Sequence, residues 1–123
     1  MRTERLVYFS AEEEEFANLL IGIGLRKNIA KVLVFLANHP EASSRAVERG
    51  ADMRQPEVSL VMRALMDYGW ISSRETRFES RGRPVCMYRL AKPLPEIMDC
   101  IESEKRKEAT DRLAMIQRLR SFV

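Results

Sequence analysis

Arginine is the only basic residue type between residues 43 and 90 of this chain. The nine residues are Arg45, Arg49, Arg54, Arg63, Arg74, Arg77, Arg81, Arg83 and Arg89, and all five lysines lie outside this window. The planar guanidinium of arginine forms paired hydrogen bonds with phosphate oxygens and with the edge of guanine. An arginine-rich genome would give the same bias, so residue type alone leaves both explanations open. Their positions within the predicted elements have to separate the two.

Residue patterns typical of catalytic or metal sites are missing. Cys86 and Cys100 form no CxxC pair and His39 is the only histidine, which argues against a structural zinc site and a disulfide framework. Gly22 and Gly24 follow no predicted strand, so they do not form a nucleotide-binding loop. No nucleophile is paired with the histidine, for which a solvated or dipole-paired role at a helix end is expected. We predict no enzyme, no metal and no cofactor.

Length and composition predict one small cytoplasmic protein. The 123 residues are 46% hydrophobic and 32% charged, with a formal net charge of +3 and a pI near 9.1. This mild basic excess permits a polyanion partner without requiring one. The start, MRTERLVYFS, lacks the apolar core of a signal peptide. The longest apolar runs, 19–25 and 32–37, fall short of the roughly 20 residues that span a bilayer.

Helical periodicity and capping signals predict four helices before residue 70. Ser10 and Glu13 have the spacing of a capping box at the start of the first helix. Ser43 or Ser44 caps the short third helix, and a tight turn at 50–53 leads into the fourth. The predicted helices cover about residues 11–22, 26–38, 44–49 and 55–68.

Two strands are predicted next, at 70–75 and 85–90. A helix-turn-helix followed by a β-hairpin is the layout of a winged helix. The predicted fold is therefore mainly α with a β-hairpin wing (α+β), with an extra N-terminal helix and a long C-terminal helix. We expect a DNA-binding domain over residues 1–92 and a C-terminal helix, a dimerisation element, over residues 93–123.

The fourth predicted helix, in the stretch RQPEVSLVMRAL, has two different faces. A step of 100° per residue gathers a buried stripe of Val58, Val61, Met62 and Leu65. The opposite face carries Pro56, Ser59, Leu60, Arg63 and Asp67. Against DNA, Arg63 suits guanine or phosphate, Ser59 suits base or backbone, and Leu60 suits a thymine methyl group. The alternative is an ordinary amphipathic helix whose outer face is solvated.

The start of this helix is marked by a proline. Pro56 lacks an N–H that a first turn does not need, and it pushes Gln55 toward an extended conformation. Gln55 is therefore the predicted N-cap, with its amide placed to reach an adenine. Glu57 suits the helix dipole but opposes phosphate, so it either accepts from cytosine or holds an arginine in place.

These segments resemble winged helix-turn-helix transcription regulators of the MarR and TrmB-like groups, especially small archaeal-type regulators. The matching stretches are SRAVERGA at 44–51, RQPEVSLVMRALMDYGWI at 54–71 and GRPVCMYRL at 82–90. The resemblance covers about residues 26–90 and implies dimeric binding to operator DNA. Carried over, it implies that the reading residues are Arg54, Gln55, Pro56, Ser59, Leu60 and Arg63. The wing loop, 76–84, is longer than in a compact regulator.

The predicted wing ends in the sequence RGRP, which also looks like the core of an AT-hook. Narrow minor grooves attract arginine, so Arg81 and Arg83 are predicted minor-groove contacts and Arg74 and Arg77 phosphate contacts. The alternative is structural: Gly82 makes a turn and the following proline protects a strand start.

The last predicted helix, to about residue 121, has apolar ends and a polar middle at 102–107. Its apolar residues are Ile97, Met98, Ile101, Leu113, Ile116, Leu119 and Phe122. A helix that packs on its own domain first and reaches a partner later fits this pattern, and a symmetric homodimer is the simplest partner. The alternative is a helix folded back along its own domain.

The function predicted from sequence is sequence-specific binding of double-stranded DNA by a transcription regulator. The alternative is a winged helix used for protein–protein interaction in a transcription or RNA-processing assembly. The operator, the direction of regulation and any small-molecule effector are not encoded in a recognisable pattern. Met53, Met62 and Met66 are assigned to the core and not to a ligand pocket.

Overall fold

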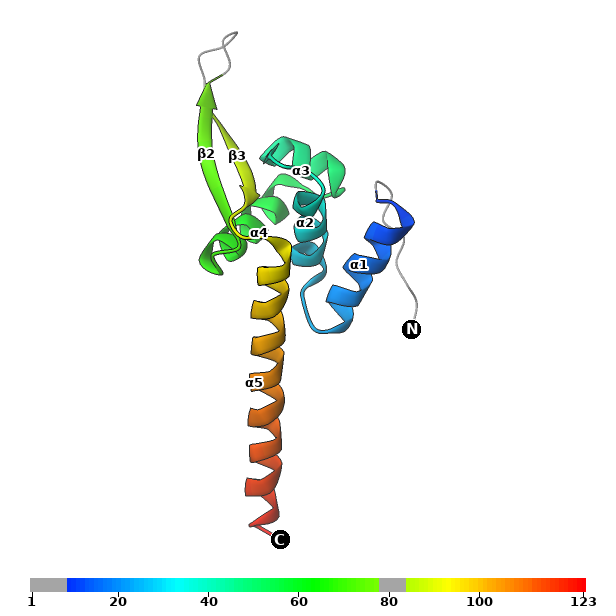
Figure 1. The fold of residues 1–123 in the computed structure, drawn as a ribbon, viewed down its shortest axis with the longest axis vertical. Helices are drawn as coiled ribbons and strands as arrows, with labels where there is room; N and C mark the ends of the chain where they lie inside the picture. Colours follow the sequence, from blue (N-terminus) through cyan, green and yellow to red (C-terminus); the bar gives the residue numbers. More distant parts are fainter. Residues whose placement is uncertain (1–8, 78–83) are drawn as a thin grey trace. The chain divides into compact units, whose positions relative to one another are not determined.

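The computed structural model describes residues 9–77 and 84–123 of the chain (Figure 1). Two compact units are distinguished, residues 1–92 and residues 93–123. In chain order the elements are α1 (Ala11–Gly22), α2 (Lys27–Ala37), β1 (Ala42–Ser43), α3 (Ser44–Gly50), α4 (Gln55–Asp67), β2 (Ile71–Arg77), β3 (Pro84–Leu90) and α5 (Leu94–Arg120). Every predicted helix is present, with ends that differ by a residue or two.

The sheet is antiparallel, with the strand order β1-β3-β2. β2 and β3 form a hairpin whose pairing runs from Ile71 opposite Leu90 to Arg77 opposite Pro84. In Figure 1 this hairpin extends beyond the neighbouring helices. β2 is longer than predicted, because Thr76 and Arg77 continue the ladder instead of opening the loop. β1 was not predicted, since a strand of two residues has no readable periodicity.

The capping box of α1 is confirmed. The Glu13 N–H donates to the Ser10 hydroxyl oxygen at 3.2 Å, and the Ser10 N–H donates to the Glu13 carboxylate at 2.8 Å. At α3 the cap is Ser43, whose hydroxyl oxygen accepts from the Ala46 N–H at 3.1 Å. These local bonds satisfy N–H groups that a helix start leaves without partners, and so they define where both helices begin.

The N-cap of α4 is Arg54, so the prediction of Gln55 was wrong. Gln55 lies inside the helix as its first residue. The Arg54 N–H donates to the Glu57 carboxylate at 3.0 Å, and the Arg54 carbonyl accepts from the Val58 N–H at 3.0 Å. These two bonds start the helix one residue earlier than the proline indicated, because the residue before a proline is only biased away from helical angles.

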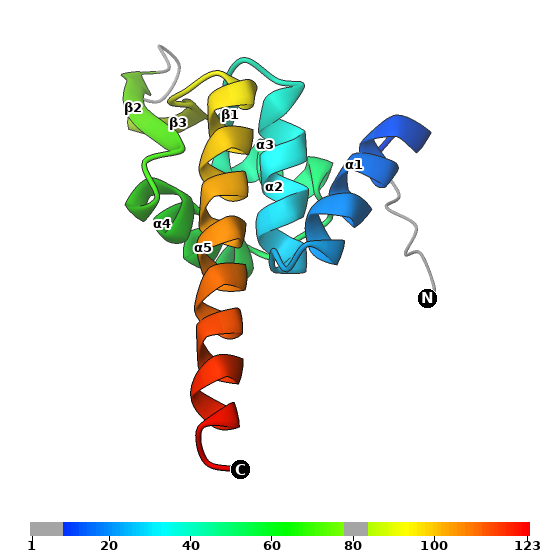
Figure 2. The same ribbon diagram turned by 60° about the horizontal axis from the view of Figure 1, so that its bottom comes forward.

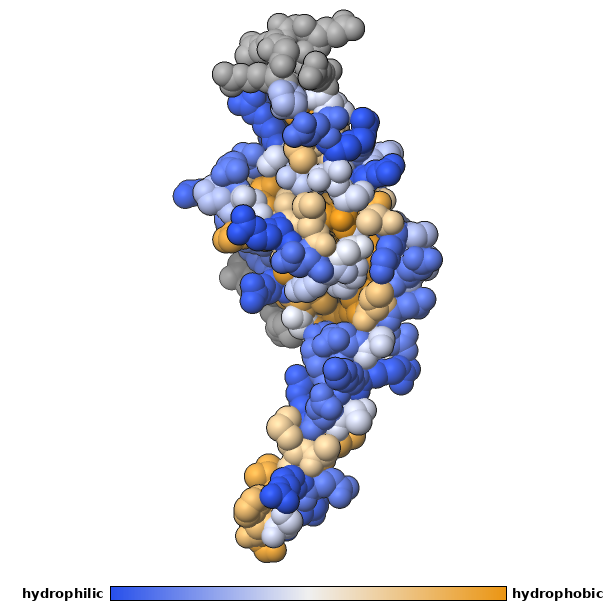
Figure 3. Space-filling model, turned by 90° about the vertical axis from the view of Figure 1, so that its left-hand side faces the viewer, coloured by the Kyte–Doolittle hydropathy of each residue, from blue (hydrophilic) through white to orange (hydrophobic). Residues whose placement is uncertain are grey.

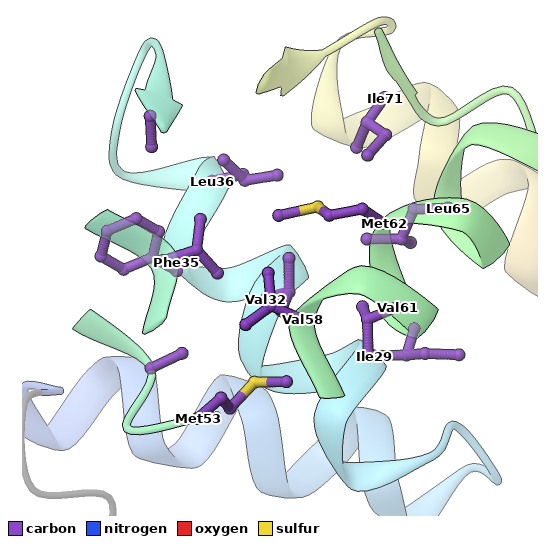
Figure 4. Packing of buried hydrophobic residues seen from close by; sticks show 13 residues of the cluster. Ile29, Val32, Phe35, Leu36, Met53, Val58, Val61, Met62, Leu65 and Ile71 are labelled. Carbon is purple, nitrogen blue, oxygen red and sulfur yellow. The ribbon is translucent and has the colours of Figure 1, made fainter. Parts of the chain in front are cut away.

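The core of the first unit forms where α2 packs against α4 (Figure 4). Figure 4 shows side chains of the two helices pointing toward one another, with Val32 of α2 beside Val58 of α4. The predicted stripe of α4 is confirmed, since Val58, Val61, Met62 and Leu65 are all buried. α1 lies beside α2 in both Figure 1 and Figure 2 and buries Ala17 and Leu20.

Met66 does not belong to this core. It is 44% exposed, whereas Met53 and Met62 are buried as predicted. Residues four apart on a helix drift by about 40° around its axis, because one turn takes 3.6 residues. The drift moves Met66 from the edge of the buried stripe to the surface.

The turn between α3 and α4 is held by α2. A side chain at Gly50 would overlap the Phe35 ring, so glycine lets the end of α3 approach α2 closely. Asp52 has a left-handed backbone, with φ of 53°. Its carbonyl accepts from Nζ of Lys31, a lysine that is only 7% exposed, at 3.4 Å. These contacts set the point at which α4 begins.

The second unit is a single helix of 27 residues, α5, which begins after Pro93. Ion pairs along its polar middle join Arg106 to Glu102 at 2.7 Å and Lys105 to Glu108 at 3.2 Å. Its far end is different, because a group of large apolar side chains is exposed there and appears as the orange end of the helix in Figure 3. This distal apolar face consists of Leu113, Met115, Ile116, Leu119 and Phe122.

Candidate nucleic-acid interface

The outer face of α4 is exposed along its length. All six residues that were predicted to read DNA on this helix are exposed: Arg54, Gln55, Pro56, Ser59, Leu60 and Arg63. The opposite face is buried, so packing against α2 directs these side chains outward. Leu60 is an apolar residue on this polar face and is 70% exposed.

Three of these residues line one groove, which we call the recognition groove. It has a volume of about 390 Å³ and lies between the start of α3, the outer face of α4 and strand β3. Its lining consists of Ser44, Gln55, Ser59, Met62, Arg63, Met66, Asp67 and Tyr88. Hydroxyl, amide and guanidinium groups therefore share one open surface, where they can form hydrogen bonds with a polar ligand.

Sequence reasoning missed Ser44 and Tyr88 as members of this surface. Ser44 is the first residue of α3, directly after the cap. Tyr88 reaches the groove because β3 pairs with β1, where it lies opposite Ala42. Burial raises the pKa of the Tyr88 hydroxyl, which therefore stays protonated and able to donate. The short strand that creates this contact had no sequence signal.

Leu60 lines a second groove, of about 470 Å³, on the other side of α4. This groove also contains Arg26, Lys27 and Asn28 from the start of α2. Arg26 and Lys27 are exposed, so two cations and an apolar side chain border the same open surface. Neither cation was predicted as a site residue, because each lies about thirty positions before α4 in the sequence.

Glu57 acts as part of the helix start. Its carboxylate accepts from the Arg54 N–H at 3.0 Å and from Nδ2 of Asn28 at 3.4 Å. The bond from the Arg54 backbone lowers the pKa of Glu57 below its usual value, and the Asn28 amide adds to this effect. Glu57, which we expected from the sequence to repel phosphate, therefore uses its carboxylate to join α4 to α2.

The arginines of the hairpin are not equivalent. Nη2 of Arg74 donates to Oε1 of Glu41 at 2.6 Å, and its Nε donates to the other carboxylate oxygen. This pairing lowers the pKa of Glu41 and raises the pKa of Arg74. Arg77 lies in β2 opposite Pro84, at the end of the paired region. Arg81, Arg83 and the turn at Gly82 lie outside the described residues.

His39 has the helix-end role expected of it. Its Nδ1 donates to the Phe35 carbonyl at 2.8 Å, and its ring stacks on the Phe35 ring with centroids 4.0 Å apart. Within residues 9–77 and 84–123, no three His, Cys, Asp or Glu side chains gather as metal ligands would. In the same part of the chain, no helix is long and apolar enough to cross a membrane.

Solved structures that are similar to this one include proteins described as transcription regulators. No family model and no curated protein matches the sequence. A possible transcriptional regulator from Methanosarcina mazei Go1 is similar with a TM-score of 0.62 and 17% identity, over 84% of this chain and 83% of that one. A MarR family transcriptional regulator from Silicibacter pomeroyi DSS is similar with a TM-score of 0.52 and 14% identity, over 84% and 67%. The chain has a winged helix-turn-helix fold.

The winged helix is also found in TrmBL2, an archaeal chromatin protein described as showing a novel mode of DNA binding. That likeness has a TM-score of 0.66 and 14% identity, and it covers 89% of this chain but only 39% of TrmBL2. The predicted fold class is confirmed by these similarities together with the observed elements. In this winged helix-turn-helix fold, α3 and α4 are the two helices of the helix-turn-helix and the β2–β3 hairpin is the wing.

Proposed function

We propose that this protein is a transcription regulator that binds double-stranded DNA in a sequence-specific manner. The observation that carries the proposal is the recognition groove, in which Gln55, Ser59 and Arg63 of α4 share an exposed surface with Ser44 of α3. In helix-turn-helix proteins the second helix enters the major groove and the first crosses the backbone. The same placement here would put α4 against base edges and the start of α3 against phosphate.

Each outward side chain of α4 suits a particular contact. Arg63 can pair with O6 and N7 of guanine, and Gln55 with N6 and N7 of adenine. Leu60, which is 70% exposed, would bury its side chain against a thymine methyl group. Arg54 and Pro56 would lie at the leading end of the helix. Arg26 and Lys27, which border Leu60, add a phosphate contact that the sequence did not suggest.

The wing extends the contact beyond the major groove. We propose that Arg77 contacts the DNA backbone and that Arg81 and Arg83 enter a minor groove rich in A·T pairs, where the potential is most negative. Arg74 is set apart from them by its pairing with Glu41. A regulator of this kind acts where the DNA is, and we place it in the cytoplasm.

The proposed active form is a homodimer joined through α5. The distal apolar face is 47–73% exposed, which is unusual for a monomer in water. Packing the distal apolar faces of two copies against each other would remove these side chains from water.

Selection of duplexes from a random library by the purified protein tests the proposal. We expect enrichment of a two-fold symmetric site and binding that weakens steeply with salt. Arg63→Gln should lower affinity for the selected duplex by about 1–3 kcal/mol and relax the preference at one base pair. Lys107→Gln, with the same change of charge on the exposed polar middle of α5, is the matched control. No enrichment, together with equal affinities of the wild type and Arg63→Gln at low salt, would favour the protein-interaction module instead.

A further inference from the structure

An ion pair with two hydrogen bonds joins Glu41, just before β1, to Arg74 of β2. Two guanidinium nitrogens of Arg74 donate to the two oxygens of Glu41, one of them at 2.6 Å. The side chain of Glu41 is 24% exposed and that of Arg74 is 58% exposed. The planar fork of arginine fits a carboxylate and a phosphate in the same way. The same edge of the Arg74 guanidinium can therefore bind either the Glu41 carboxylate or a DNA phosphate.

The two partners lie on opposite sides of the central strand. Glu41 directly precedes β1, where Ala42 lies opposite Tyr88 of β3. Arg74 is on β2, opposite Met87 of the same strand. Because β3 lies between β1 and β2, the ion pair crosses it and joins the two outer strands. The contact spans 33 positions of sequence and ties the wing to the helical part of the domain.

Arg89 is a second cation acting on Glu41. Its charge lowers the pKa of the Glu41 carboxyl, after the larger effect of Arg74. The carboxylate therefore stays charged at neutral pH and keeps Arg74 occupied. Exposed ion pairs contribute little to stability, so the main effect of this one is to set the direction of the guanidinium.

We propose that Glu41 is a positioning residue that holds Arg74 against the sheet and keeps it out of the phosphate contacts of the wing. Arg74 then orients the wing, while arginines nearer its tip bind DNA. This inference rests on the proposed DNA-binding function. It replaces the phosphate contact that the sequence suggested for Arg74, and it makes Glu41→Gln a change that adds a DNA contact.

Glu41→Gln, Arg74→Gln and the double variant test this role in the full-length chain. The affinity of each for the selected duplex is measured over a series of salt concentrations. Each phosphate contact adds ~0.9 to the slope of log affinity against log salt. We expect Glu41→Gln to steepen the slope by about one contact and to tighten binding several-fold at low salt. Arg74→Gln should leave the wild-type slope unchanged, and the double variant should lose the gain.

Glu75→Gln is the matched control, because Glu75 is exposed on the same strand and the substitution changes the net charge equally. Equal effects of Glu41→Gln and Glu75→Gln would overturn the inference, and so would a shallower slope in Arg74→Gln. A gain that persists in the double variant would overturn it as well. Arg63→Gln separates the two proposals: loss of affinity there with no change in Glu41→Gln rejects only this inference. Absence of duplex binding by the wild type rejects both.

Discussion

The helices α4 and α5 differ in what covers their apolar residues. Val58, Val61, Met62 and Leu65 of α4 are buried against α2, and the side chains left outside are mostly polar. On the distal part of α5 the large apolar side chains are the exposed ones. The apolar face of α4 is already covered, so the surface that remains is polar and suits a polar ligand. The distal apolar face of α5 is exposed, so it suits a second protein chain.

The largest expected effect comes from opening the buried face of α4. Leu65→Ala removes a fully buried side chain and should lower the free energy of unfolding by about 2–5 kcal/mol, because a cavity remains in the packed core. Urea unfolding followed by circular dichroism measures it. Leu60→Ala, on the exposed face of the same helix, should change stability by less than about 0.5 kcal/mol. Similar losses in both variants would mean that α4 does not face inward as described.

The second prediction concerns α5. Leu119→Glu places a charge in the distal apolar face and should convert a dimer into a monomer, since each of two copies loses about 1.5–3 kcal/mol of apolar burial. Ala114→Glu, on the opposite side of the same turns, adds the same charge and should leave the dimer intact. Sedimentation velocity at micromolar concentration compares them. If Leu119→Glu keeps the mass of the wild type, the distal apolar face of α5 is not the dimer interface.

Local and periodic features of this fold could be predicted from sequence. The capping box of Ser10 and Glu13 is a contact three residues long, and the stripe of α4 repeats with the helical period. The hairpin follows from two short stretches with strand-forming residues on either side of a polar segment that contains a glycine. Each signal is contained in a window of about twenty residues or fewer, so no knowledge of the tertiary structure is needed.

Contacts between distant segments could not be predicted. The Glu57 carboxylate, which bonds the N-cap of α4 at Arg54, also accepts from Asn28 of α2, 29 positions earlier. The recognition groove includes Tyr88 through a strand of two residues. The pairing of Arg74 with Glu41 joins positions 33 apart, and neither residue type nor spacing marks it. In each case the partner was visible in the sequence but its proximity was not.

The third prediction tests how α4 is positioned. Gly50→Ala introduces a methyl group into space occupied by the Phe35 ring and should destabilise the fold by about 1–3 kcal/mol, because the aromatic ring must shift within a packed core. In a Phe35→Leu background the ring is absent, so Gly50→Ala should cost less stability there than in the wild type. Thermal melts of the four proteins form the cycle. Additive losses would show that the ring and the glycine do not touch.

The smallest expected effect on stability is at Glu57, on the exposed polar face of α4. The Arg54 N–H lowers the pKa of this carboxyl in the folded state, so the charged form favours folding. Its contribution is therefore complete above the unfolded pKa, near 4.5, and is lost as the pH falls through the lower folded value. Glu57→Gln should lower the melting temperature slightly at pH 7 and have no effect near pH 2. Because the carboxylate is exposed, a difference that persists at pH 2 would mean that Glu57 stabilises α4 by packing and not by its charge-assisted bond to the start of the helix.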